Sequence, residues 1–287
     1  MEKKINLKLS RRLLLLLCMM LAGVMLTSVA LYLMSTSGLL VMLTVQDILV
    51  FILPAVLTMA ILYKRPLHVM GLDRAPSWCA VAIVALFYVV SLPAMNWLVD
   101  LNKAMSLPSW MAGVEQAMRS MEDEATQTTL QLLDIDSFWQ FIFTVAVVGV
   151  MAGLSEEMLF RGAMLRTMQD SRLGKHAVVW MTAILFSALH MQFYGFVPRM
   201  LLGVWLGYLL VWTGNLWVPI IAHTMNNSTV VLFSYLSNKG IVAESFGDNL
   251  GLPSPGVFPW LAVFSLLASI AIAVGANKFF REKEKIN

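Results

Sequence analysis

Residues 13–34 read LLLLLCMMLAGVMLTSVALYLM, an uncharged apolar run that follows a lead of five basic residues. A helix needs about 20 apolar residues to cross a bilayer core about 30 Å thick. The apolar region of a signal peptide is shorter, about 7–15 residues. The run therefore predicts a first transmembrane helix, with a cleaved signal peptide as the less favoured alternative.

The composition of the whole chain agrees with this interpretation. The 287 residues are 59% hydrophobic and 13% charged, with a mean hydropathy of +0.76. An average soluble domain has about 45–50% apolar and about 25% charged residues. A water-soluble globule and a disordered chain are therefore excluded, and two cysteines are too few for a disulfide scaffold. The expected partner is the lipid bilayer, and no nucleic-acid partner is expected.

Seven more apolar runs follow the first. We expect helices in all of them, because backbone polar groups in lipid must be satisfied within the segment and the runs lack the alternation of a membrane barrel. The predicted fold class is all-α: a polytopic membrane protein with about eight transmembrane helices, forming a single integral domain over residues 1–287. The further spans are 39–63, 78–98, 137–159 with an extension to Met168, 176–194, 197–212, 216–236 and 257–277.

The distribution of basic residues indicates how the chain is oriented in the membrane. With eight spans, 16 of the 20 Lys and Arg residues fall on the side of the N-terminus. The positive-inside rule then places both termini in the cytoplasm. Together with the compact loops, this bias favours a bacterial inner membrane, with the endoplasmic reticulum as the alternative. The short sixth span could instead be re-entrant.

One connection is long, at residues 99–136. It contains apolar residues at helical spacing, including Trp110, Val114 and Met118, opposite a charged face. The pattern is typical of a helix lying on the outer membrane surface. An ordinary helix in a soluble loop explains the pattern equally well.

The motif SEEMLFRG at residues 155–162 places two carboxylates in an apolar helix. An ionisable residue there costs about 2.5–3.5 kcal/mol on insertion scales, so it requires a reason. Glu157 and Arg161 are four residues apart, in the favourable order for an ion pair, which leaves Glu156 free. A free carboxylate suits a general base. The alternative is a pair of charges that anchors the helix at the membrane boundary.

Two further predicted helices carry polar residues. His190 lies in the run 176–194, and His223 and Asn227 share a face of the run 216–236. Taken singly, they are explained by core packing or helix–helix hydrogen bonds. Together with Glu156, they could form a polar site inside a helix bundle, able to activate a water and stabilise an oxyanion. Asp47, in the second run, has no evident partner.

These residues form three motifs in order: E-E-x-x-x-R, F-x-x-x-H and H-x-x-x-N. The chain thereby resembles the CAAX prenyl protease and bacteriocin-processing family (CPBP, or Abi) of intramembrane proteases. The resemblance covers residues 137–236, which would form the catalytic core. Its motif residues are Glu156, Glu157, Arg161, Phe186, His190, His223 and Asn227.

The resemblance implies an eight-helix bundle with an intramembrane catalytic cavity. It also implies hydrolysis of peptide bonds in membrane-associated proteins or peptides. The implied roles are water activation by Glu156 with help from His190, an oxyanion hole from His223 and Asn227, and structural support from Glu157 and Arg161.

The sequence leaves alternatives open for the metal dependence and for the function. Glu156, His190 and His223 could hold zinc with one open position, although the sequence contains no H-E-x-x-H motif. A metal-free glutamate protease is slightly favoured. A proton-coupled transporter is a second reading, against which no inverted repeat is found. A non-catalytic scaffold in bacteriocin self-immunity is a third.

Overall fold

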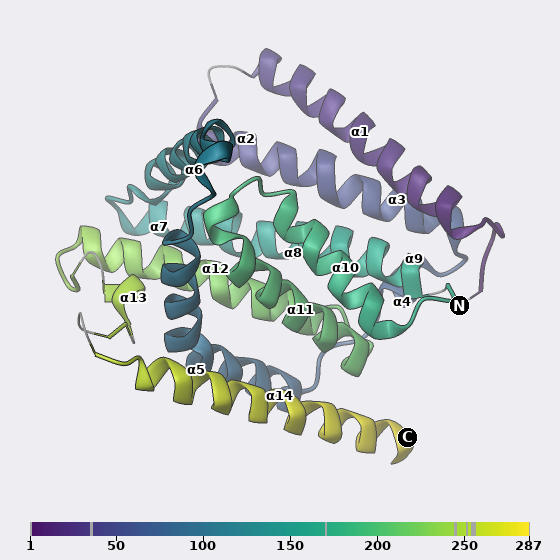
Figure 1. The fold of residues 1–287 in the computed structure, drawn as a ribbon. Coiled ribbons are helices and arrows are strands. Elements are labelled where there is room, and N and C mark those ends of the chain that lie inside the picture. Colours follow the sequence, from purple (N-terminus) through teal and green to yellow (C-terminus); the bar gives the residue numbers. More distant parts are fainter. Residues whose placement is uncertain are drawn as a thin grey trace.

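The computed structural model describes residues 2–34, 37–169, 171–243, 246–250, 252–253 and 257–286. Within these residues the chain forms helices and turns, and it contains no strand beyond an isolated bridge between Lys3 and Tyr63. Figure 1 shows the long helices lying side by side. The protein is a polytopic helical membrane protein, which confirms the predicted fold class.

All eight expected segments form helices. Two of them contain π-helical stretches (η) and are therefore divided into several elements. The segments are α1 (Leu9–Leu33); α2 (Leu39–Gln46), η1 (Asp47–Ile52) and α3 (Leu53–Leu62); α5 (Trp78–Lys103); α7 (Phe138–Thr144), η3 (Val145–Met151), α8 (Ala152–Glu157), η4 (Met158–Leu165) and α9 (Arg166–Gln169); α10 (Lys175–Ala188); α11 (Phe196–Thr213); α12 (Trp217–Asn238); and α14 (Trp260–Ile286). The shorter elements are α4 (Pro66–Met70), η2 (Ser109–Met111), η5 (Phe193–Gly195) and α13 (Phe246–Asn249), and the long connection forms α6 (Ala112–Leu133).

Six of these segments are long and apolar enough to cross a membrane within the part of the chain that is described. The other two are α10 and α12. Helix α10 has 14 residues, which corresponds to about 21 Å at 1.5 Å per residue. Helix α12 has 22 residues but contains a run of polar side chains around His223. A count of eight crossings therefore stays a prediction.

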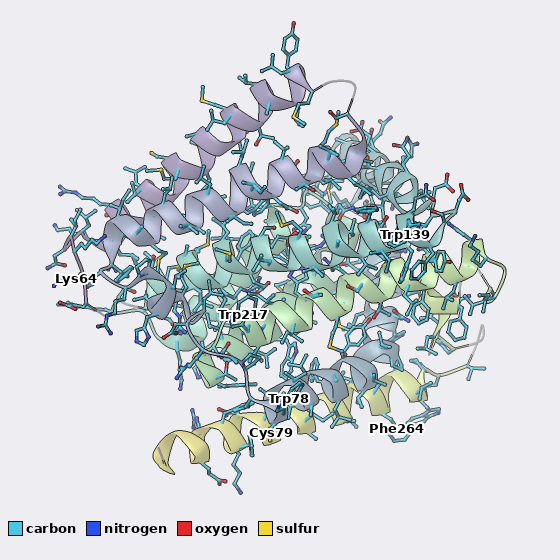
Figure 2. All side chains as sticks on the ribbon, turned by 180° about the vertical axis from the view of Figure 1, so that it is seen from behind. Lys64, Trp78, Cys79, Trp139, Trp217 and Phe264 are labelled. Carbon is cyan, nitrogen blue, oxygen red and sulfur yellow. The ribbon has the colours of Figure 1, made fainter. Side chains whose placement is uncertain are left out.

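The surface of the helices is apolar. Trp78, Trp139 and Phe264 are 88%, 70% and 61% exposed, and Figure 2 labels all three on the side-chain view. Lys64 and Trp139 lie at opposite ends of the helices in the same view. The N-terminal end of α1 and the C-terminal end of α14 lie at one end of the molecule (Figure 1). This arrangement agrees with termini on one side of a membrane.

Helix α6 covers the turn between α10 and α11. None of its 22 residues is buried. Arg119 donates to Glu115 over 2.7 Å, and its guanidinium lies 4.4 Å from the centroid of the Tyr194 ring in that turn. The Tyr194 backbone N–H donates to Glu122. The hydrogen bonds from Arg119 hold the pKa of the Glu115 carboxyl below its usual range. The predicted helix in the long connection is present and attached at a defined place.

Candidate active site

The two glutamates end α8, a short α-helical piece between two π-helical stretches, η3 and η4. Such stretches are rare and are frequently found at functional sites. Glu157 and Arg161 form the ion pair that their spacing predicts, with 2.6 Å between Arg161 Nη1 and Glu157 Oε1. Both side chains are fully buried. Arg161 Nη2 also donates to the Gly203 carbonyl of α11, which ties this helix to its neighbour.

Hydrogen bonds fix the orientation of both histidine rings. His223 Nδ1 donates to Glu157 Oε1 over 3.0 Å, and His190 Nδ1 donates to the Phe186 carbonyl over 2.7 Å. A carboxylate and a carbonyl accept only, so each Nδ1 carries a proton. The Nε2 atom of each ring is therefore the one that faces Glu156. Glu157 accepts from both Arg161 and His223 and so connects these two side chains.

Phe186 lies at the centre of this group. It is 1% exposed, and its ring packs edge-on against the rings of His190 and His223, at centroid distances of 4.9 and 5.9 Å. The Arg161 guanidinium lies 4.6 Å from the same ring centroid. One aromatic side chain therefore contacts both histidines and the buried cation.

The carboxylate of Glu156 lies near the Nε2 atoms of both histidines. Its Oε2 lies 3.8 Å from His190 Nε2 and 3.9 Å from His223 Nε2. These separations are too long for hydrogen bonds. The same Oε2 atom is buried and has no hydrogen-bond partner among the described residues. Leaving a buried carboxylate oxygen unsatisfied is costly, which makes Glu156 Oε2 a candidate for binding a water or a substrate group.

Asn227 is close to this group but is partly engaged elsewhere. Its Nδ2 donates to the Val148 carbonyl of η3 over 3.1 Å. Its Oδ1 accepts from Asn226 Nδ2, also over 3.1 Å. One of the two amide protons is thus used in holding α12 against η3. The predicted oxyanion role requires the second amide proton.

Asp47 has no evident partner in the sequence, and the structure supplies one. Ser155 Oγ donates to Asp47 Oδ1 over 3.0 Å, from α8 to η1. Ser155 is fully buried and Asp47 is 8% exposed. The two residues are 108 positions apart, and only an apolar run interrupted by an acid marked one of them. This contact braces the residue that directly precedes Glu156.

His190 differs from its expected place inside a long helix. Helix α10 ends at Ala188, and His190 lies two residues beyond it. Met191 then adopts a left-handed conformation with a φ of 56°, which residues with a side chain rarely do. The chain thereby turns toward η5 directly after the histidine. A strained backbone next to the site agrees with a functional constraint on this turn.

Two glycines allow α12 to approach the helix that carries the glutamates. A Cβ atom on Gly149 would lie 2.3 Å from Ser228 Oγ, and one on Gly153 would lie 2.8 Å from Thr224 Oγ1 and 3.0 Å from its backbone N. The pattern G-x-x-x-G against small hydroxyl residues is typical of close packing between membrane helices. The distance between Glu156 and His223 depends on this approach.

We expect Gly153→Ala to lower activity strongly, because the added methyl group moves α12 and widens the gap to Glu156. The matched control is Gly275→Ala, whose methyl group would meet no atom within 4 Å. Both variants would be compared in the cleavage assay described below and by thermal unfolding. Equal activity of the two variants would contradict the packing argument.

Glu156, His190 and His223 are the side chains that could hold a zinc ion. Ligands of a tetrahedral zinc with bonds of about 2.0–2.1 Å lie about 3.3 Å apart. The distances from Glu156 Oε2 to the two histidine nitrogens are longer, at 3.8 and 3.9 Å. Within the part of the chain that is described, no three His, Cys, Asp or Glu side chains are placed to hold a metal ion. The residues do not fit zinc as they stand.

The fold and the site together define a class: a helical membrane protein with a buried carboxylate that faces two oriented histidines. Residues 138–229 match a family model described as type II CAAX prenyl endopeptidase Rce1-like. The match confirms the resemblance that the three motifs indicated. It covers every motif residue, namely Glu156, Glu157, Arg161, Phe186, His190, His223 and Asn227.

Two bacterial relatives are similar to parts of the chain. The uncharacterized protein YpbD of Bacillus subtilis (strain 168) is 33% identical over 78 residues, which is 26% of this chain and 36% of YpbD. The membrane-embedded CAAX protease MroQ of Staphylococcus aureus (strain USA300) is 32% identical over 107 residues, or 35% of this chain and 42% of MroQ. The matches thus span less than half of either relative. No solved structure matches the chain.

Proposed function

We propose that this protein is an intramembrane endopeptidase that hydrolyses peptide bonds of membrane-associated proteins or peptides. The observation that carries the proposal is the buried, unpartnered Glu156 Oε2 facing the Nε2 atoms of His190 and His223. The similarity of residues 138–229 to a CAAX endopeptidase family supports it, as does the similarity to MroQ, a membrane-embedded CAAX protease.

In the proposed reaction, a water occupies the space between Glu156 and the two histidines. Glu156 takes a proton from this water while the water oxygen attacks the carbonyl carbon of the scissile bond. The protonated Glu156 carboxyl then gives this proton to the peptide nitrogen as the C–N bond breaks, which releases the amine. His190 assists by accepting from or donating to the water through Nε2. Its Nδ1–H is held by the Phe186 carbonyl, which keeps the ring in this orientation.

The oxyanion that develops on the carbonyl needs donors aimed at it. His223, when protonated on Nε2, and the second amide proton of Asn227 supply these donors in the proposal. Glu157 favours the protonated ring, because its carboxylate accepts from His223 Nδ1. Arg161 balances the charge of Glu157 in turn.

We further propose a bacterial plasma membrane as the location, with both termini in the cytoplasm. Both relatives that match are bacterial. The excess of basic residues on the side of the N-terminus supports the orientation. Cysteine accessibility labelling near Lys3 and near Lys64 in intact cells would test it.

The test uses full-length protein in lipid nanodiscs, incubated with peptides that carry one transmembrane anchor. We expect new peptide termini to appear with the wild type and to be lost with His190→Ala and with His223→Ala. Mass spectrometry would map the cleaved bonds. If the wild type, His190→Ala and His223→Ala cleave the peptide at the same rate, the site is assigned wrongly. Proton-coupled flux in liposomes without any cleavage would favour the transporter instead.

A second arm tests metal dependence. We expect cleavage to persist after treatment with a strong zinc chelator, because the spacing of the three donors does not fit zinc. Elemental analysis of the same preparation would give the zinc content per chain. Loss of cleavage that is restored by added zinc, with one zinc per chain, would overturn the metal-free version and leave the hydrolase proposal in place.

A further inference from the structure

We infer that a large apolar cavity on the other side of α12 binds the acyl chains of a phospholipid. The cavity has a volume of about 1080 Å³ and lies between α5, α11, α12 and α14, with the end of α6 at its rim. The site is distinct from the one around Glu156, and the inference does not rest on the proposed peptidase activity.

The two sites use different faces of α12. Ala222, Asn226, Thr229 and Phe233 line the cavity, at the spacing of one helix face. His223 belongs to the neighbouring face, which meets Glu157. Glu156, His190 and His223 are not among the residues that line the cavity. Helix α12 is therefore a wall shared by a polar site and an apolar one.

The cavity is built by a bend in α5. Pro93 cannot donate a backbone hydrogen bond and loosens the helix at this point. Ser265 of α14 inserts its hydroxyl into the opened turn, where it accepts from the Ala94 backbone N–H over 3.1 Å and donates to the Val90 carbonyl. Figure 1 shows the two parts of α5 meeting at an angle, one beside α14 and one rising toward α6. Since side-chain hydrogen bonds hold the bend, the space beside it is a fixed feature.

The walls suit an aliphatic ligand. Phe87 and Trp205 are stacked with 3.7 Å between their ring centroids, and Trp212 packs against Trp205 at 5.8 Å. Three hydroxyl groups in the wall donate within their own helices, from Ser91, Thr229 and Ser269. Most of the surface that lines the cavity is apolar, which suits a hydrocarbon chain.

The cavity is elongated. Along α12 the lining runs from Ala222 to Asn238, about 24 Å at 1.5 Å per residue. Extended hydrocarbon chains are long and thin and match this length.

One end of the cavity is polar, which favours a whole phospholipid over a free hydrocarbon. There Asn238 Nδ2 of α12 donates to the Leu133 carbonyl at the end of α6, and Gln131 and Asp134 of the same segment also line the cavity. The aromatic cluster of Phe87, Trp205 and Trp212 lines the walls together with Ala222. A headgroup at the amide end, including a cationic amine near Asp134, leaves the acyl chains among the apolar side chains.

The test uses full-length protein in nanodiscs that contain a phosphatidylethanolamine with a photoreactive acyl chain. After illumination, mass spectrometry would locate the labelled residues. We expect label on cavity residues of α11 and α12, such as Trp205 and Phe233. Filling the cavity with Ala273→Phe should remove this label. The matched control is Ala268→Phe, also on α14 but exposed and outside the cavity, which should retain it.

Label confined to outward residues such as Val274 in the wild type would overturn the inference. Cavity label that survives in Ala273→Phe would overturn it as well. Size-exclusion profile and thermal unfolding would establish that both variants fold. If Ala273→Phe does not fold, Ala273→Leu, a smaller filling of the same place, is expected to reduce the cavity label, and unchanged label would again overturn the inference.

Discussion

Replacement of Glu156 by glutamine is expected to lower kcat/KM for an anchored peptide by about 10²–10⁴, the usual contribution of a general base. The amide has nearly the shape of the carboxylate but cannot take a proton from water. Because Glu156 Oε2 has no hydrogen-bond partner among the described residues, its replacement removes no contact that holds the fold. We therefore expect the thermal midpoint to be unchanged or slightly raised.

The measurement is the rate of peptide cleavage by matched preparations of the two proteins, together with thermal unfolding. Glu124→Gln serves as the control, since Glu124 is exposed on α6 and lies outside the site. The control should retain full activity. A Glu156→Gln protein that cleaves at the wild-type rate would remove Glu156 from the mechanism.

Replacement of Arg161 by methionine is expected to destabilise the protein by about 3–5 kcal/mol. Arg161 and Glu157 are both fully buried, so the loss of one leaves an uncompensated charge in an apolar interior. The bond from Arg161 Nη2 to the Gly203 carbonyl is lost as well. The double variant Glu157→Gln/Arg161→Met should recover part of this loss, because it removes the second charge too.

Unfolding of the detergent-solubilised proteins, followed by heat or denaturant, would measure these differences. Arg119→Met is the matched control: Arg119 and Glu115 form an equally short ion pair, but the Arg119 side chain is 49% exposed. An exposed pair of this kind is expected to contribute about 1 kcal/mol or less. Equal losses of unfolding free energy in the two variants would show that burial does not increase the contribution of the Arg161 pair to stability.

The length and hydropathy of local segments predicted most of the fold. The apolar runs gave helices at the expected places, since length and hydropathy are properties of contiguous residues. The ion pair between Glu157 and Arg161 was predictable for the same reason, because four residues along a helix fix the geometry. The motif residues were also marked, since polar side chains are conspicuous in an apolar chain.

Features that depend on distant segments could not be predicted. The bond between Asp47 and Ser155 joins residues 108 positions apart, and nothing in either local pattern specifies the other. The cavity beside α12 requires a proline in α5 and a serine in α14 to meet. The early end of α10 was also missed: the apolar run continues past Ala188, and the left-handed Met191 ends the helix in the structure.

The shortness of α10 also has a consequence for the surrounding lipid. Fourteen residues span about 21 Å, whereas a typical hydrocarbon core is about 30 Å thick. Non-helical backbone within that depth must be covered by protein or line a water-filled space. The turn with His190 and Tyr194 meets this requirement through α6 on its outer side. A crossing by α10 would therefore place the site next to a part of the bilayer that is thinner than average or covered by α6, and the hydration of the site would depend on the bilayer thickness there.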